Sequence, residues 1–147
     1  MENTIQTQQK LAAIMFTDII SFSKMTGNNE KKALSILHEH NGLLSEQFTK
    51  HNGNVIKELG DGYLTEFPSS LESVNAAIAI QSSLYVYNAT KEIDNRINIR
   101  IGIHLGDIVK AENNDILGDG VNIASRLESM SPPGGVLVSK NIYAYFS

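Results

Sequence analysis

INIRIGIHLG, residues 97–106, carries the clearest strand pattern of the chain. An aliphatic residue occupies every second position from Ile97 to Leu105, and the residues between them are polar or glycine. Successive side chains of a β-strand point to opposite faces of a sheet, so this alternation predicts a strand with one buried face and one available face. Asn98, Arg100 and His104 are expected on the available face.

Strand-like and helix-like segments alternate on both sides of this strand. The expected elements are strands at 11–18, 53–59, 63–67 and 134–140, and helices at 30–51, at about 69–90 and at 121–130. With the strand at 97–106, the order β-α-β-β-α-β predicts an α+β fold. We expect a ferredoxin-like antiparallel sheet with helices packed on one face.

Apolar residues at helical spacing predict the buried faces of the two long helices. They are Leu34, Leu37, Leu44 and Phe48 in the first helix and Leu71, Val74, Ile78 and Leu84 in the second. Gly42 is expected to weaken the first helix without ending it. Gly60 and Gly62 flank Asp61 between two strands, and this pattern predicts a tight hairpin because glycine readily adopts positive φ.

Composition limits the class of protein. A chain of 147 residues without cysteine indicates one domain in a reducing compartment, and we expect a cytoplasmic protein. A net charge of −4 without a basic cluster argues against a nucleic-acid polymer as partner, and none is expected. Residues 1–10 are expected to form a polar tail and 11–147 the domain. The lack of a long apolar run predicts no membrane contact by this segment.

Asp18 and Asp61 are the first candidate pair. Asp18 ends the first strand and Asp61 lies at the hairpin tip, and in this topology both points can meet at one rim of the sheet. Two carboxylates there would repel each other unless a cation lay between them, and Mg²⁺ prefers such hard oxygen ligands. The alternative is that Asp18 caps a helix and Asp61 is only a good turn former.

Residues 115–129, DILGDGVNIASRLES, form the second candidate. In a helix, Asn122, Ser125, Arg126 and Ser129 fall on one polar stripe, and an opposite apolar stripe is expected at Ile123, Leu127 and Met130. Asn122 and Arg126 can then orient a hydroxyl and stabilise charge on a phosphoryl group. The alternative is a solvated helix face with Asp119 as the N-cap.

Lys57 is the third candidate. It shares a strand phase with Val55 and Leu59, which is unusual for an ammonium group if that face is core. The alternative is a surface lysine whose stem covers apolar neighbours. The four histidines, at 38, 40, 51 and 104, show no zinc-binding spacing and are expected to be surface or partly buried residues.

Three blocks then resemble those of a known family. FTDIISFS (16–23), VIKELGDGYLTEF (55–67) and DILGDGVNIASR (115–126), in this order and spacing, resemble the signature blocks of class III nucleotidyl cyclase catalytic domains, the adenylate and guanylate cyclases. The resemblance covers about residues 11–146. It implies a homodimer with two active sites at the interface, each converting a nucleoside triphosphate to its 3′,5′-cyclic monophosphate and pyrophosphate.

The resemblance also implies residue roles. Asp18, Asp61 and the carbonyl of Ile19 would hold Mg²⁺ or Mn²⁺, two ions per active site. The triphosphate would be lined by Phe22, Ser23, Leu59 and Gly60.

Lys57 and Asp115 match the pair that reads the base, and in adenylate cyclases such a pair contacts adenine, whereas guanylate cyclases usually carry Glu and Cys. ATP is therefore the expected substrate. Asn122 would orient the ribose and Arg126 would stabilise the transition state, both from the subunit opposite the metal ligands.

Two departures from the family pattern stand out. Ser21 takes the place of a usual Gly, and the family's C-terminal hairpin, with a further phosphate-binding lysine, is expected to be missing after Ser147. A weakly active or inactive nucleotide-sensing and dimerisation module, or a cyclase for another nucleotide such as GTP, therefore stays open. Regulatory or sensor domains are expected elsewhere in the native protein.

Overall fold

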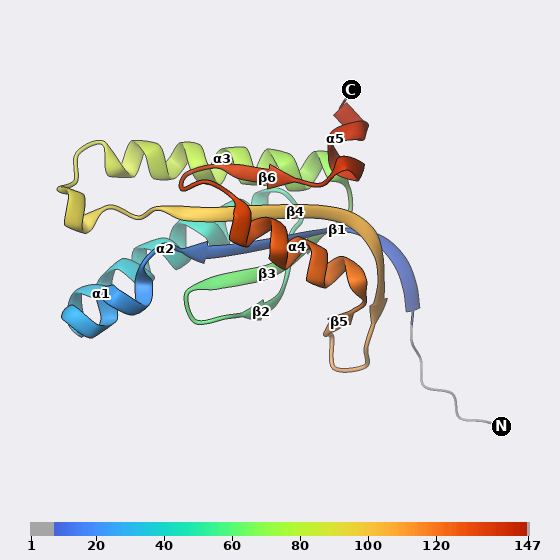
Figure 1. Ribbon diagram of the computed structural model, residues 1–147, viewed down its shortest axis with the longest axis horizontal. Helices are drawn as coiled ribbons and strands as arrows, with labels where there is room; N and C mark the ends of the chain where they lie inside the picture. The colour runs from blue at the N-terminus through green and yellow to red at the C-terminus, as the bar shows by residue number, and fades with distance from the viewer. Residues whose placement is uncertain (1–7, 147) are drawn as a thin grey trace.

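The computed structural model describes residues 8–146 and contains one curved sheet flanked by helices (Figure 1). The strands are β1 (Gln8–Ile19), β2 (Asn54–Glu58), β3 (Gly62–Phe67), β4 (Ile99–Lys110), β5 (Ile116–Leu117) and β6 (Val136–Val138). The helices are α1 (Phe22–Asn28), α2 (Glu30–Lys50), α3 (Ser70–Asn88), α4 (Asp119–Met130) and α5 (Lys140–Phe146), with the short 3₁₀ turn η1 (Ile93–Asn95).

The strand order is β2-β3-β1-β4-β5, and these neighbours are all antiparallel. β1 and β4 form the long centre of the sheet and pair from Gln8 opposite Lys110 to Ile19 opposite Ile99. The predicted α+β fold with a ferredoxin-like antiparallel sheet is confirmed. β6 adds one feature to it, because it runs parallel to β4, with Ile101 opposite Val136.

Two apolar layers cover the two faces of the sheet. Ala13 and Met15 of β1 pack with α2 and α3, whereas Ala12 and Ile14 pack in a second cluster with Ala124 of α4. Figure 1 shows α4 in front of β4 and β1. The expectation of helices on one face therefore holds for α2 and α3, while α4 lies on the opposite face.

The alternation in residues 97–106 correctly predicts the buried face of β4. Ile97, Ile99, Ile101 and Ile103 are fully buried. The prediction of an available second face holds only in part. Asn98 is exposed and Arg100 is partly exposed, whereas α4 covers the middle of this face and His104 is only 8% exposed. Gly102 permits this packing, because a Cβ there would lie 2.2 Å from the backbone nitrogen of Glu128 in α4.

The predicted long helices are present, but their buried faces differ from the expectation. Leu34 is 60% exposed and Ile78 is 55% exposed, while Leu44, Phe48 and Leu84 are buried as expected. The buried faces also include smaller residues, namely Ala33 in α2 and Ser70, Ser73, Ala76 and Ala77 in α3. Small side chains allow close approach to the sheet, and apolar spacing alone does not reveal this.

The ends of elements also differ from the expectation. Gln8–Lys10 belong to β1 and not to a tail, and the rest of the expected tail lies outside the described residues. α1 and β5 were not expected, because each is too short for a periodic pattern. In the described part of the chain, no helix has the length and apolar character needed to cross a bilayer.

Candidate active site

Asp18 and Asp61 come together at one rim of the sheet. Asp18 is opposite Gly62 in the β1–β3 ladder, and Asp61 is the residue directly before Gly62. The backbone N–H of Ile19 donates a hydrogen bond of 2.8 Å to the carbonyl of Asp61. Gly60 has a φ of +87°, and a Cβ on Gly62 would lie 1.7 Å from the carbonyl oxygen of Thr17. Both glycines are therefore needed for this turn to close against β1.

Asp18 faces a third acid, Glu128 of α4, which was not among the residues predicted from the sequence. Oδ1 of Asp18 and Oε2 of Glu128 are buried, and neither has a hydrogen-bond donor within residues 8–146. Two carboxyl groups can bond to each other only when one carries a proton. Burial, followed by the contact with Asp18, raises the pKa of Glu128 to about 8. Burial also raises the pKa of Asp18, and the nearby charge of Asp61 adds to this.

Arg100 supplies the nearest cationic group. It is opposite Asp18 in the β1–β4 ladder, and its charge acts to lower the pKa of both Asp18 and Glu128. Its Nε donates to the carbonyl of Ser131 at 3.1 Å. The guanidinium thus lies beside the acidic cluster, although it does not offset the effect of burial on either acid.

The donor set at this rim suits a hard divalent cation. A buried carboxylate oxygen without a donor, next to a second aspartate, is the kind of ligand that Mg²⁺ and Mn²⁺ prefer. No group of three or more His, Asp or Glu side chains that could hold a metal ion is found among the described residues. Further ligands would have to be backbone carbonyls or substrate oxygens. The alternative role of Asp18 as a helix cap is excluded, because Ser21 is the N-cap of α1.

The expected triphosphate-lining residues lie around the same rim. Phe22 and Ser23 form the first turn of α1, where Phe22 packs against the core and Ser23 is exposed. Leu59 and Gly60 are exposed in the β2–β3 turn. Ser21 has a φ of +64°, a left-handed conformation that glycine adopts without the penalty of a side chain. The backbone conformation explains why glycine suits this position.

Lys57 and Asp115 are already paired within one chain. Lys57 Nζ lies 3.0 Å from Oδ2 of Asp115, and the backbone N–H of Ile116 donates to Oδ1 at 2.8 Å. The hydrogen bond from Lys57 and the one from Ile116 lower the pKa of Asp115. Asp115 directly precedes β5, and β2 and β5 end the strand order on opposite sides. Curvature of β4 toward β5 allows the two edges to meet (Figure 1).

A β-bulge directs Lys57 toward this partner. The register shifts between Val55, which is opposite Thr65, and Lys57, which is opposite Leu64. Neighbouring residues of β3 point to opposite faces, so Val55 and Lys57 do as well. The predicted shared phase of these two residues is therefore wrong. The bulge places Lys57 on the face that carries Leu64 and α4.

Asn122 and Arg126 do not reach the acids of their own chain. Both are exposed on α4, whereas Ala124 and Glu128, on the other side of the helix, are buried against the sheet. The expected apolar stripe is wrong, since Met130 is 66% exposed and the buried stripe is Gly120, Ala124 and Glu128. The alternative interpretation, with Asp119 as the N-cap, is also wrong on this point, because Gly118 is the N-cap of α4.

Two histidines lie deeper than expected. His40 of α2 is fully buried and stacks on Tyr63, with 5.9 Å between ring centroids. Burial lowers the pKa of His40 and of His104. His40 Nδ1 is 2.9 Å from Oδ1 of Asn41, whose amide also donates to Glu58 at 3.2 Å. A polar layer therefore packs behind the β2–β3 turn that carries Asp61.

The model of the adenylate and guanylate cyclase catalytic domain matches residues 5–147. The chain belongs to the class III nucleotide cyclase family. This cyclase domain is 37% identical over 139 residues to putative adenylate cyclase 3 of Rhizobium meliloti (strain 1021), covering 94% of the chain and 24% of that protein. It is 26% identical over 145 residues to receptor-type guanylate cyclase gcy-23 of Caenorhabditis elegans, covering 88% of the chain and 14% of that protein.

A solved structure supports the same membership. The adenylate/guanylate cyclase/hydrolase of Silicibacter pomeroyi superposes with a TM-score of 0.88 and 32% identity, covering 95% of this chain and 81% of that one. The cyclase domain thus spans about a quarter or less of the two curated relatives named above. Both adenylate and guanylate cyclases are among its relatives, so membership alone leaves the base unassigned.

Proposed function

We propose that this cyclase domain converts ATP to 3′,5′-cyclic AMP and pyrophosphate at the interface of two copies of the chain. The observation that carries the proposal is the convergence of Asp18 and Asp61 at one rim, with a buried Asp18 oxygen that has no donor among the described residues. Such an arrangement is costly in the free protein and is offset when a cation binds.

Asp18, Asp61 and the carbonyl of Ile19 would hold the divalent ions. Bound there, Mg²⁺ or Mn²⁺, two per active site by family resemblance, would lower the pKa of the ribose 3′-hydroxyl and neutralise charge on the phosphate oxygens. Exposed groups at the start of α1 and in the β2–β3 turn, namely Ser23 and Gly60, would position the triphosphate. Arg100, beside Asp18, would add positive charge at the same rim.

The Lys57–Asp115 pair supports ATP as the substrate. A carboxylate accepts from the adenine exocyclic amine and an ammonium donates to a ring nitrogen, and both groups are already held 3.0 Å apart. GTP is the second candidate, because guanylate cyclases are among the relatives. Competition between ATP and GTP at equal concentration, with both cyclic products separated by chromatography, tests the assignment.

The exposed side of α4 supports a shared site. Asn122 and Arg126 point away from the acids of their own chain, so they would have to orient ribose and stabilise the transition state in a partner's site. One chain alone would then hold two incomplete halves. Activity should therefore fall steeply on dilution.

Mixing two inactive variants tests the shared site directly. Asp18→Asn removes a metal ligand and Arg126→Ala removes the transition-state group, so each homodimer should be nearly inactive. Equal mixing should restore about a quarter of the wild-type activity, since half of the dimers are mixed and each mixed dimer has one intact site. Mixing Asp18→Asn with Asp61→Asn is the control and should restore nothing.

Concentrated wild-type protein with Mn²⁺ and ATP gives the primary test. Formation of cyclic AMP is expected. Absence of any cyclic nucleotide, both from residues 1–147 and from a longer natural chain, would overturn the enzyme assignment. Nucleotide binding without product would indicate a sensing or dimerisation module instead. We also propose that further domains of a longer native protein regulate the dimer.

A further inference from the structure

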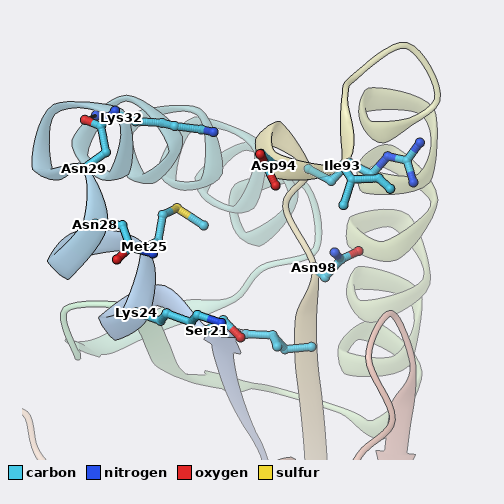
Figure 2. A pocket seen from close by; sticks show the side chains of 11 residues that line it. Ser21, Lys24, Met25, Asn28, Asn29, Lys32, Ile93, Asp94 and Asn98 are labelled. Atoms are coloured by element: carbon cyan, nitrogen blue, oxygen red, sulfur yellow. Dashed lines mark hydrogen bonds between the residues drawn. The ribbon is translucent and has the colours of Figure 1, made fainter.

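A sizeable cavity of the described chain lies away from the acidic rim. It has a volume of about 550 Å³ and lies between α1, the start of α2, and the segment from η1 to β4. Figure 2 shows Lys32 extending from α2 toward Asp94 of η1, with Lys24 and Ser21 along another side. This cavity is large enough for a small molecule.

The cavity is separate from the candidate active site. Ser21, Lys24, Met25 and Asn28 line it at i, i+3, i+4 and i+7, so they share one side of α1. Ser23 is not among the lining residues. The helices around the cavity follow the α2–α3 face of the sheet, whereas Asp18 faces Glu128 of α4 on the opposite face.

Positive charge dominates the lining. Lys24, Lys32 and Arg96 carry three cations against the single acid Asp94. The cavity lining is therefore positively charged, although the whole chain has a net charge of −4. The ion pairs found between described residues include neither Lys24 nor Lys32, and Arg96 uses its Nε on the carbonyl of Lys91 at 3.1 Å. Both ammonium groups are therefore free to contact a ligand.

The neutral polar groups add further donors. Asn29 uses its Oδ1 to accept from the backbone N–H of Lys32 at 3.1 Å, and this leaves its amide NH₂. Asn28 and Asn98 also line the cavity. Converging ammonium, guanidinium and amide donors around one space match an anion with several acceptor oxygens.

We propose that this cavity binds a small multiply charged anion of the polyphosphate class, either inorganic or carried by a nucleotide. Lysine ammonium groups bind phosphate as point charges, and three cations at different sides can each face a separate charged oxygen group. Three apolar residues, Ile20, Met25 and Ile93, line the rest, and Ile93 is 77% exposed, so an apolar ligand would gain little burial. Because Ser21 joins the cavity to the loop after Asp18, occupancy would restrain the start of α1.

Calorimetry without divalent ions tests the proposal. Inorganic tripolyphosphate is titrated into wild-type protein and into the double variant Lys24→Gln, Lys32→Gln, in the presence of a chelator. Affinity should fall by about a hundredfold in the double variant, since it loses two charge contacts and each is worth roughly a tenfold change. Both side chains are at least partly exposed, so the variant should keep the wild-type fold.

Lys31→Gln is the matched control. It removes the same charge one residue away on α2, from an exposed side chain that does not line the cavity. Its affinity for tripolyphosphate should stay within about twofold of wild type. Equal weakening by Lys31→Gln and by the double variant would show nonspecific attraction, and it would overturn the proposal. So would absence of binding to the wild type.

ATP distinguishes the two sources of the polyphosphate group. Titration of ATP under the same conditions measures binding that the double variant loses and the control keeps. A larger loss for ATP than for tripolyphosphate assigns a nucleotide, and a larger loss for tripolyphosphate assigns an inorganic ligand. ATP binding that is unaffected by the double variant belongs to the active site. If the binding of tripolyphosphate is unaffected as well, the cavity is not an anion site.

Discussion

The carbonyl of Asp61 accepts a 2.8 Å hydrogen bond from the N–H of Ile19, and this bond ties the hairpin tip to the end of β1. Two acids 43 positions apart in sequence are thereby fixed at one rim by the backbone. The rigidity of this contact means that neutralising either acid should leave the fold unchanged.

Asp18→Asn should abolish cyclase activity without loss of stability. The amide is isosteric with the carboxylate, carries no charge to bury and does not repel Asp61, so the free energy of unfolding should stay equal or rise. Turnover with Mn²⁺ should fall by about 10²–10³ or more, the typical cost of losing one electrostatic contact in a preorganised site. Steady-state kinetics and thermal unfolding of the same sample check this. A variant that retained full turnover would remove Asp18 from the metal site.

Stability should depend on pH through Glu128. The pKa of a glutamate is ordinarily 4.5, as in an unfolded chain, and it is about 8 for Glu128 in the folded chain. Between these two pH values the folded state therefore holds a proton that the unfolded state releases. The contribution of Glu128 to the free energy of unfolding should therefore be highest below about pH 4.5. It should fall as the pH rises to about 8 and stay constant above that pH.

Glu128→Gln should reduce this fall, because glutamine has no proton to lose. The variant should exceed the wild type at pH 8.5 by on the order of 1–3 kcal/mol in urea unfolding without divalent ions, and the difference should shrink at pH 5. An identical pH dependence of the two proteins would show that Glu128 ionises normally.

Asp115→Asn should separate specificity from stability. The Lys57 side chain is 47% exposed, and ion pairs of this kind contribute at most about 1 kcal/mol. Preference for ATP over GTP, measured as the ratio of kcat/KM values, should nevertheless change by about tenfold or more. Glu46→Gln is the control, since it breaks the exposed Lys50–Glu46 pair at 3.3 Å on α2 and should not alter the ratio.

Gly102→Ala should destabilise the protein by about 1–3 kcal/mol or more, because the new Cβ would lie 2.2 Å from the Glu128 nitrogen and 2.8 Å from the Ala124 carbonyl. Both are backbone atoms, so α4 would have to move. Gly42→Ala introduces the same methyl group inside α2, where no atom lies within 4 Å, and should stabilise by about 0.8–1 kcal/mol. Denaturant unfolding of both variants tests the contrast, and similar effects would refute it.

Local patterns account for much of the fold. The alternation from Ile97 to Leu105 reflects burial of one strand face, which depends only on the pleat, and it correctly identified the core of β4. The face on which α4 packs was not predictable in the same way, since it depends on how the β4–β5 segment returns over the sheet. His104 was therefore expected on the available face of the strand, although it is buried.

The candidate site shows the same division. The meeting of Asp18 and Asp61 follows from strand order and hairpin position, both visible in sequence. The Lys57–Asp115 contact was suggested only by family resemblance, because it joins opposite edges of a curved sheet. Glu128 was missed because a glutamate in a polar helix suggests solvent exposure. The spacing of Gly120, Ala124 and Glu128, each four residues apart, was the available signal for a close-packed stripe that includes this acid.

α4 carries Glu128 on its inner side and Arg126 on its outer side. In the proposed dimer, α4 would thus pack against the cation ligands of its own subunit and contribute Arg126 to the active site of the partner subunit. Any tilt or shift of this helix would change both active sites at the same time, so movement of α4 would couple their activities.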